Sequence, residues 1–206
     1  MKIFGTAGNY LPCAEGHAVT EDTPSQTEAP AIYLIADSAV LKNGKPFFVP
    51  DWSSRTDYEA QLVVRICRLG KGIPLRFAYR YYDAVTVGIN FCARHLQQLA
   101  CHSGEPWAVA RGFDGAAALG TFLPLSALKP PLSFRLDQNG QAVQQGSTDG
   151  LTWSIDALIC HLSRFFTLRT GDLLFTGTPP GTGPVSIGDH LQGYLGEEKV
   201  LDFYCR

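Results

Sequence analysis

Two oxygen-bearing side chains stand two positions apart in a segment rich in valine and isoleucine. They are Glu59 and Gln61, within residues 58–66. Side chains at positions i and i+2 of a strand point to the same face of the sheet. A carboxylate and an amide oxygen on one face form half of a site for a hard cation, which prefers oxygen ligands. A solvent-facing polar strand has the same pattern, so the two residues alone leave both interpretations open.

A glycine-rich segment near the C-terminal end is the second chemical candidate. Residues 176–183 read Thr-Gly-Thr-Pro-Pro-Gly-Thr-Gly. The segment is not a nucleotide phosphate loop, because no Gly-Lys-Ser/Thr follows, and its prolines block the helix start that a dinucleotide site requires. Its backbone N–H groups and threonine hydroxyls could still cradle a carboxylate. A plain tight turn is the alternative interpretation.

The third candidate is Arg94, near the start of a predicted helix. Its guanidinium could anchor an anion, because arginine matches a carboxylate with two parallel hydrogen bonds. A salt bridge without catalytic meaning explains the same residue equally well. None of these three features identifies a function by itself.

The segments that must position these residues are mostly strand-like. Short alternating or β-branched runs predict strands at residues 2–4, 31–35, 47–49, 58–66 and 84–91, on both sides of a turn at 139–140, before the glycine-rich segment, and twice between 188 and 204. Apolar spacings of three and four predict helices at 74–82, 93–101 and 152–166. Polar residues 15–30 predict an exposed loop or lid. The sequence therefore predicts one α+β, β-rich domain over residues 1–206.

Composition excludes several classes of protein. The 206 residues carry 17 basic and 19 acidic side chains, a net charge of -2. This near balance argues against a nucleic-acid binder with a basic face and against a long disordered chain. No apolar stretch reaches membrane-spanning length and no signal-peptide pattern is present, so we expect no membrane partner and a cytoplasmic location. The six cysteines form no C-x-x-C pair, which predicts reduced thiols, most of them in the core.

Taken together, the motifs resemble the fumarylacetoacetate hydrolase superfamily along nearly the whole chain. The strongest match is residues 168–183, with Gly171-Asp172 and Thr176-Gly177-Thr178-Pro179. The other matching segments are Asn9-Tyr10, Asp37-Ser38-Ala39, 57–62, Tyr82-Asp83, 89–97 and 107–114. The resemblance implies a β-roll or sandwich with a few flanking helices, usually a homodimer. It also implies a hydrolase or isomerase of small 2-oxo or enol dicarboxylates that uses Mg²⁺ or Mn²⁺.

The resemblance transfers site roles to particular residues. The metal-ligand positions are Glu59, Gln61 and Asn90. The lysine of the family's tryptophan motif is Arg111 here, and the His/Glu pair that activates water in the hydrolases falls at Cys13 and Gly16, with Glu15 nearby. Candidate catalytic residues are thus Arg111, Cys13 and Glu15. The substrate-binding candidates are Tyr10, Arg94, Gln97, Gly177 and Thr178.

Two of the three metal-ligand positions have lost their charge. Three carboxylates would give a formal charge of -3, whereas Glu59, Gln61 and Asn90 give -1. Because ligand charge tunes the affinity of hard-cation sites, we predict metal binding that is weak or absent. Two interpretations follow: an enzyme of this family with impaired chemistry, or a catalytically inactive, dimeric paralogue that binds a small anion or serves a structural role.

Overall fold

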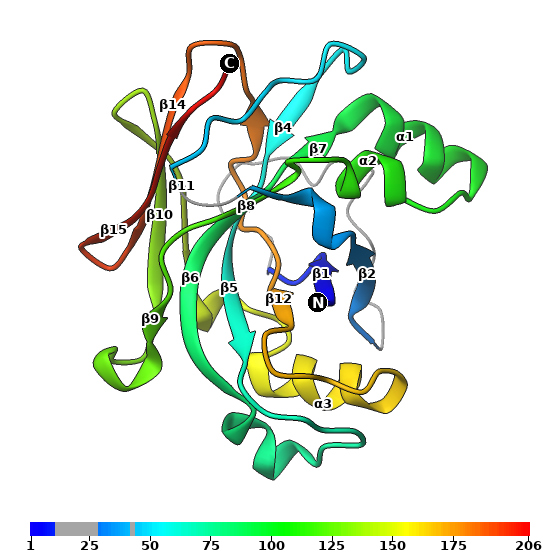
Figure 1. Cartoon of the computed structure of the whole chain (residues 1–206), viewed down its shortest axis with the longest axis vertical. Helices are drawn as coiled ribbons and strands as arrows, with labels where there is room; N and C mark the ends of the chain where they lie inside the picture. Colours follow the sequence, from blue (N-terminus) through cyan, green and yellow to red (C-terminus); the bar gives the residue numbers. More distant parts are fainter. Residues whose placement is uncertain (11–28, 42–43) are drawn as a thin grey trace.

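The computed structural model of the chain describes residues 1–10, 29–41 and 44–206 (Figure 1). An eight-stranded mixed sheet forms its centre. In sheet order its strands are β2 (Ala31–Ile35), β1 (Ile3–Ala7), β12 (Leu173–Phe175), β5 (Ala60–Ile66), β6 (Tyr82–Asn90), β8 (Ala117–Leu119) and β3 (Val40–Leu41), with β9 (Leu123–Pro124) also paired to β6. This β-rich architecture with few helices confirms the predicted fold class.

Two smaller sheets complete the strand framework. The four-stranded sheet contains β11 (Gln141–Ser147), β10 (Ser133–Gln138), β14 (His190–Leu195) and β15 (Glu198–Tyr204). The three-stranded sheet contains β13 (Gly183–Pro184), β4 (Thr56–Tyr58) and β7 (Cys92–Ala93). Figure 1 shows the four-stranded sheet on the opposite side of the curved β5–β6 pair from β1 and β2. Both β14 and β15 contact β6, so the two larger sheets enclose the core between them.

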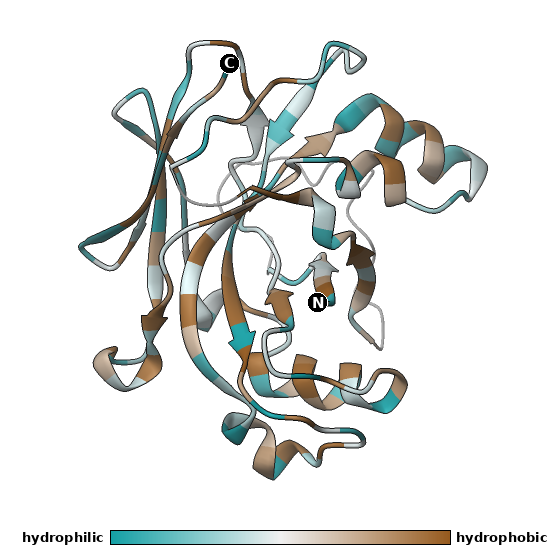
Figure 2. Cartoon of the chain, viewed as in Figure 1, coloured by the Kyte–Doolittle hydropathy of each residue, from teal (hydrophilic) through white to brown (hydrophobic). Residues whose placement is uncertain are grey.

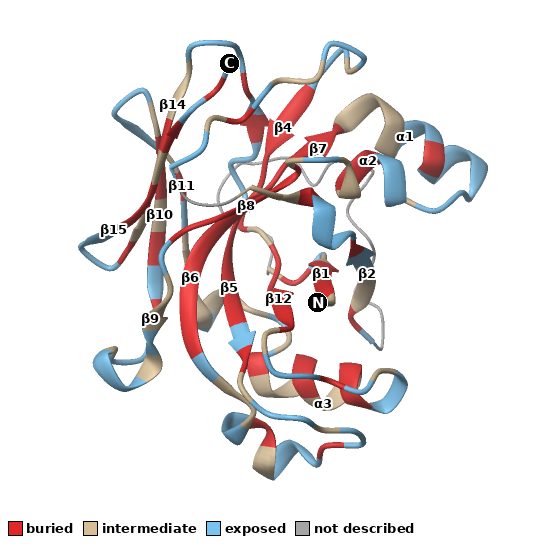
Figure 3. Cartoon of the chain, in the orientation of Figure 1, coloured by how far each residue is buried: buried red, intermediate tan, exposed pale blue. Residues whose placement is uncertain are grey.

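Strands β5 and β6 are the most deeply buried part of the fold. Figure 2 shows hydrophobic residues along both strands, and Figure 3 shows that most of their length is buried. Leu62, Val63 and Val64 are all inaccessible to solvent. The strand predicted within residues 58–66 is present as β5, but its predicted half-burial is wrong, because protein covers both faces of this strand. A strand covered on both sides reads as a continuous apolar run instead of an alternating one.

Three α-helices flank the sheets: α1 (Arg94–Ser103), α2 (Ala108–Gly112) and α3 (Ile155–Phe165). The predicted helix 152–166 is α3, which begins where the hydroxyl of Ser154 accepts a hydrogen bond from the Ala157 N–H (3.2 Å). Its apolar face buries Leu158, Ile159 and Leu162. The predicted helix 93–101 is α1, which ends at Gly104 in a left-handed conformation (φ 69°).

The remaining turns of helix are short 3₁₀ segments. They are η1 (Asp37–Ala39), η2 (Leu75–Arg80), η3 (Leu125–Ala127) and η4 (Thr148–Gly150). The helix predicted over residues 74–82 is the 3₁₀ helix η2, and it is shorter than predicted because β6 begins at Tyr82. The strand predicted at 47–49 is also wrong: Phe47 makes only an isolated bridge to Cys205.

The cysteines are less buried than predicted. Among the five in the described part of the chain, only Cys92 and Cys205 are buried, and Cys101 is exposed. The sixth, Cys13, lies outside the described residues. No helix in the described ranges is long and apolar enough to span a membrane.

Candidate functional site

A break in the strand places Glu59 in the interior. It lies between β4 and β5, and its carbonyl oxygen accepts the Asn90 N–H at 3.0 Å. Asn90 is the last residue of β6, so two strand ends meet here. Glu59 and Gln61 are 3% and 1% exposed, which rules out the solvent-facing strand as the explanation of their spacing. Polar groups this deeply buried need partners.

The partner of Glu59 is Arg111, which α2 carries into the same place. Arg111 Nη1 donates to Glu59 Oε2 at 2.6 Å, and Nη2 donates to Glu59 Oε1 at 2.9 Å. Both side chains are buried. The pair is a two-bond, charge-assisted contact, the strongest type of arginine–carboxylate interaction.

Asn90 is held by donors and acceptors on every side. Its Oδ1 accepts the Tyr33 hydroxyl at 2.8 Å and lies 3.5 Å from Arg111 Nη1. Its Nδ2 donates to the carbonyl oxygens of Arg111 (3.0 Å) and Ala116 (3.2 Å). The amide is thus oriented by two carbonyls, which an aspartate in its place would repel. An asparagine therefore suits this position better than the aspartate that the resemblance leads one to expect.

A second guanidinium reaches Glu59 from α1. Arg94 Nη2 lies 3.2 Å from Glu59 Oε1, Nε donates to Asp57 Oδ2 at 2.9 Å, and Nη1 donates to Gln97 Oε1 at 2.8 Å. Arg55 donates to Asp57 Oδ1 at 2.7 Å. Three guanidinium groups therefore meet two carboxylates, a formal surplus of one positive charge. Arg94 does form a salt bridge, as one of its two interpretations held, but the bridge leads directly into the candidate site.

The protonation states of this site follow from burial and charge. Burial is the largest single influence on Arg111 and opposes its charge, but the charge and hydrogen bonds of Glu59 together with the nearby Tyr33 and Cys92 raise the Arg111 pKa well above its ordinary value. Burial raises the pKa of the Tyr33 hydroxyl to about 12 and that of the Cys92 thiol to about 11, although Arg111 lowers both. Tyr33 and Cys92 are therefore protonated at neutral pH and are not bases there.

The glycine-rich segment joins the site through Gln61. The Gly177 N–H donates to Gln61 Oε1 at 2.8 Å, in a backbone conformation (φ 107°) that favours glycine. Gln144 on β11 braces the same segment, because its Nε2 donates to Thr178 Oγ1 (3.0 Å) and to the Pro179 carbonyl (2.8 Å). The segment is therefore tied to the buried strand next to Glu59 and is more than a plain turn.

The structure brings most of the predicted site residues together. One hydrogen-bonded network holds Glu59, Asn90, Arg94, Gln97 and Arg111, and an adjoining one holds Gln61, Gly177 and Thr178. Tyr10 lies apart from these bonds, beside Gly146 and Gly150, and its buried hydroxyl has no partner among the described residues. Cys13, Glu15 and nearly all of the predicted lid 15–30 lie outside the described residues.

Several side chains of this site were not predicted from the sequence: the charged Arg55 and Asp57, and the uncharged Tyr33, Trp107 and Gln144. Tyr33 and Trp107 place their rings 5.3 Å and 5.7 Å from the Arg111 guanidinium. Gln144 is 1% exposed, and its Oε1 also accepts the Ala60 N–H at 2.8 Å. Tyr33 and Gln144 sit in strands whose local pattern carries no sign of a site. Trp107 belonged to a matching segment, but nothing in the sequence indicated that its ring faces an arginine.

We expect Gln144→Leu to lower the free energy of unfolding by about 1–3 kcal/mol, since it orphans the buried Ala60 N–H and frees the Pro179 carbonyl. Urea unfolding followed by tryptophan fluorescence measures the loss. Gln141→Leu, an exposed position on the same strand, is the matched control and should change stability by less than about 0.5 kcal/mol. Equal effects of the two substitutions would contradict the bracing role.

Comparison with known proteins agrees with this site and fold. Residues 2–201 match the family described as fumarylacetoacetate (FAA) hydrolase C-terminal, so the chain belongs to that family. It is 32% identical to an Arabidopsis thaliana protein named oxaloacetate tautomerase, mitochondrial, over 92% of this chain and 84% of that protein.

Solved structures give the same result. The fold superposes on fumarylpyruvate hydrolase from Pseudomonas aeruginosa, crystallised with Mn²⁺ and pyruvate (TM-score 0.89, 30% identity, covering 100% of this chain and 89% of that one). It also superposes on 2-hydroxyhepta-2,4-diene-1,7-dioate isomerase from Mycobacterium marinum (TM-score 0.83, 26% identity, covering 99% and 73%). The relatives are thus hydrolase- and isomerase-type enzymes of small oxo-acids.

The side chains at these positions do not suit a divalent cation, although the Pseudomonas aeruginosa structure contains Mn²⁺. Both oxygens of Glu59 already bind arginine, and the amide oxygens of Gln61 and Asn90 already accept hydrogen bonds. Within the described ranges, no group of three or more His, Cys, Asp or Glu residues has the arrangement of a metal site. A cation would also enter a site with a surplus of positive charge, where Coulomb repulsion opposes it.

Proposed function

We propose that the protein binds a small 2-oxo or enol dicarboxylate at the arginine-lined site and catalyses its keto–enol isomerisation. The observation that carries this proposal is the convergence of Arg94 and Arg111 on one buried carboxylate, which leaves a positive surplus for an anion. Fixed positive charge in a buried site stabilises the enolate oxygen that develops during isomerisation. The relationship to a protein named oxaloacetate tautomerase supports the same reaction class.

Isomerisation is favoured over hydrolysis because the residues that activate water in the family's hydrolases are replaced in this chain. The positions that correspond to the water-activating His/Glu pair are Cys13 and Gly16. Without that pair, the hydrolase route loses a general base, which typically contributes about 10²–10⁴-fold in rate. Keto–enol exchange moves one proton between the enol oxygen and the neighbouring carbon and requires no activated water. Solvent water takes up and returns that proton, and the fixed charges of the site stabilise the enolate between the two transfers.

The test is the rate of enol-to-keto conversion of oxaloacetate, followed by ultraviolet absorbance with and without the protein. We expect a saturable acceleration that Arg94→Gln weakens by about tenfold or more, because it removes a charge-assisted contact. Arg76→Gln, an exposed arginine on η2, is the control and should leave the rate unchanged. Absence of acceleration would overturn the isomerase proposal, and absence of saturable binding as well would overturn the anion site.

A second candidate is a paralogue that binds the same anions without turnover. It is favoured by the raised pKa values of Tyr33 and Cys92, which burial keeps protonated at neutral pH. Calorimetric titration with oxalate, a stable dicarboxylate, separates the two candidates. Saturable oxalate binding with no acceleration of oxaloacetate conversion would establish the second.

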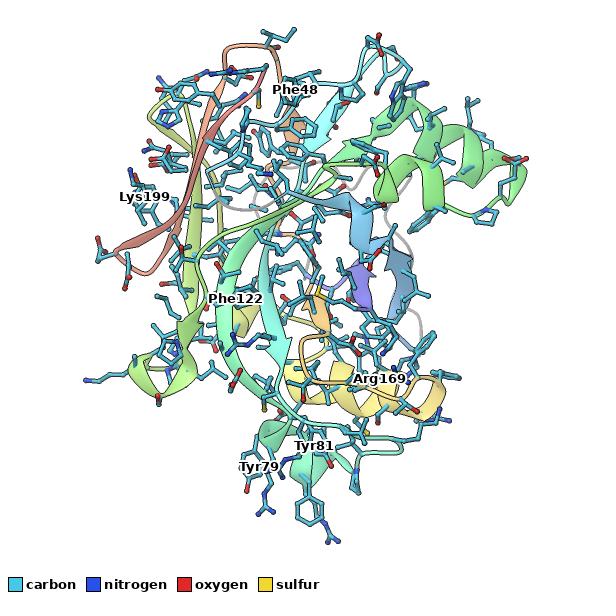
Figure 4. All side chains as sticks on the ribbon, viewed as in Figure 1. Phe48, Tyr79, Tyr81, Phe122, Arg169 and Lys199 are labelled. Atoms are coloured by element: carbon cyan, nitrogen blue, oxygen red, sulfur yellow. The ribbon has the colours of Figure 1, made fainter. Side chains whose placement is uncertain are left out.

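We also propose that the protein is a homodimer, as the resemblance to the family implies, and that it is cytoplasmic, as the sequence pattern predicts. Exposed aromatic residues support a contact surface, because contiguous exposed apolar area marks interaction sites. Phe48 and Trp52 are 69% and 49% exposed and line one shallow cavity together with Phe113. Figure 4 places Phe48 at the opposite end of the molecule from Tyr79, so the exposed aromatic residues form more than one group. Sedimentation velocity and cell fractionation test the two parts.

A further inference from the structure

The guanidinium of Arg111 has more donors than the protein accepts. An arginine side chain carries five N–H donors. Nη1 donates to Glu59 Oε2 and lies within reach of the Tyr33 hydroxyl (3.3 Å) and Asn90 Oδ1 (3.5 Å). Nη2 donates one bond, to Glu59 Oε1. The Nε–H is buried and has no partner among the described residues, although the residue is only 5% exposed.

The unused donors lie on one edge of the guanidinium. Nε–H and the second Nη2–H point in parallel along that edge, which matches the two oxygens of a carboxylate. A buried donor without an acceptor lowers the stability of the fold, so an acceptor oxygen of a bound ligand would be stabilising at this edge. The adjacent Nη1–Nη2 edge binds Glu59, and Nη1 also lies near Asn90. The arginine therefore uses one edge for the protein's own carboxylate, and the Nε–Nη2 edge keeps two donors without an acceptor among the described residues.

Aromatic walls hold this guanidinium in place. The rings of Tyr33 and Trp107 lie 5.3 Å and 5.7 Å from its central carbon, and 6.2 Å from each other. Arginine is weakly hydrated and packs favourably on aromatic faces, whereas a hydrated divalent ion does not. The aromatic rings therefore favour a guanidinium cation at this place, and so does the charge of Glu59.

We propose that Arg111 replaces the divalent ion in this chain: its guanidinium neutralises Glu59 and holds the carboxylate of the oxo-acid on its Nε–Nη2 edge, so that the ligand binds without a metal. The ligand part rests on the proposed function. The replacement of the metal rests on the contacts of Glu59, Gln61 and Asn90 and stands independently. Asn90 and Gln61 then act as neutral positioning residues, because a carboxylate at either place would compete with the ligand for positive charge.

The first experiment needs no variant. Metal-stripped wild-type protein is titrated with Mn²⁺ and followed by electron paramagnetic resonance, which reports free Mn²⁺. We expect the free-ion signal to rise as it does in buffer alone. Pyruvate is then titrated calorimetrically in EDTA and again with Mn²⁺ present, and we expect the same dissociation constant in both. Stoichiometric Mn²⁺ binding in the micromolar range, or pyruvate binding that EDTA abolishes, would overturn the proposal.

Variants then assign the effect to Arg111. Arg111→Lys keeps the charge but loses the two-donor edge, so pyruvate binding should weaken by about tenfold or more. Arg65→Lys is the matched control, because Arg65 makes an exposed pair with Asp83 (3.0 Å), and it should bind pyruvate like the wild type. Thermal unfolding of each variant identifies any that fails to fold. Unchanged pyruvate affinity in a folded Arg111→Lys protein would contradict the role.

A triple variant tests the replacement in reverse. Arg111→Lys combined with Gln61→Glu and Asn90→Asp restores three carboxylates, and we expect it to bind Mn²⁺ and to make pyruvate binding sensitive to EDTA. If the wild type binds neither pyruvate nor Mn²⁺, the oxo-acid function fails while the replacement of the metal stands. If the wild type binds pyruvate only together with Mn²⁺, the replacement fails while the oxo-acid function stands.

Discussion

Replacing Glu59 by glutamine should lower the free energy of unfolding by about 3–5 kcal/mol, because it leaves a buried guanidinium without its counter-ion. Arg111 is 5% exposed, and its two contacts with Glu59, at 2.6 Å and 2.9 Å, are the shortest it makes. An amide offers one acceptor oxygen in place of two and compensates no charge. Urea unfolding at constant ionic strength, followed by circular dichroism, measures the loss.

Two controls separate this effect from an ordinary loss of charge. Asp83→Asn removes the partner of Arg65 in an exposed pair and should cost no more than about 1 kcal/mol. Glu59→Gln combined with Arg111→Met removes both members of the buried pair and should recover much of the lost stability, since the most buried guanidinium is gone and Arg94 keeps its contact with Asp57. A single Glu59→Gln variant as stable as Asp83→Asn would show that the pair is not the electrostatic centre of the site.

Alanine at Gly177 should lower the free energy of unfolding by about 2–5 kcal/mol, combining backbone strain with a steric clash. Gly177 has φ 107°, and an added Cβ would lie 2.8 Å from the Cβ of Asn9. Asn9 cannot retreat easily, since its amide bonds the Thr176 carbonyl (2.7 Å) and both backbone groups of Trp153 (2.7 Å and 3.0 Å). We also expect weaker pyruvate binding, because the Gly177 N–H would shift away from Gln61.

The matched control for this variant is Gly188→Ala. Gly188 has a similar φ of 96°, but no atom lies within 4 Å of an added Cβ, so it isolates the backbone strain. Its cost should stay within about 1–3 kcal/mol, with pyruvate binding unchanged. If the two alanine variants lost equal stability and bound pyruvate equally, the close approach between Gly177 and Asn9 would play no part in the site.

Much of the fold is readable from local patterns. The 3–4 spacing of Leu158, Ile159 and Leu162 predicts α3, and the turn at residues 139–140 predicts the β10–β11 hairpin. Strands of two or three residues, such as β4, β7 and β13, escape prediction because so few residues define no periodicity. The burial of β5 on both faces was not predicted either, since it depends on a sheet formed by residues far along the chain.

The sequence by itself determined the identity of the site's groups: a single carboxylate at Glu59, amides at Gln61 and Asn90, and arginines at positions 94 and 111. Only the tertiary structure decided their use. Arg111 reaches Glu59 across 52 residues of chain, and Gly177 reaches Gln61 across 116. Local patterns report which face of an element is apolar, but they do not report which distant side chain meets a buried charge. Burial makes the Glu59–Arg111 contact essential, because a carboxylate away from water must be paired, and in this fold its partner is a guanidinium.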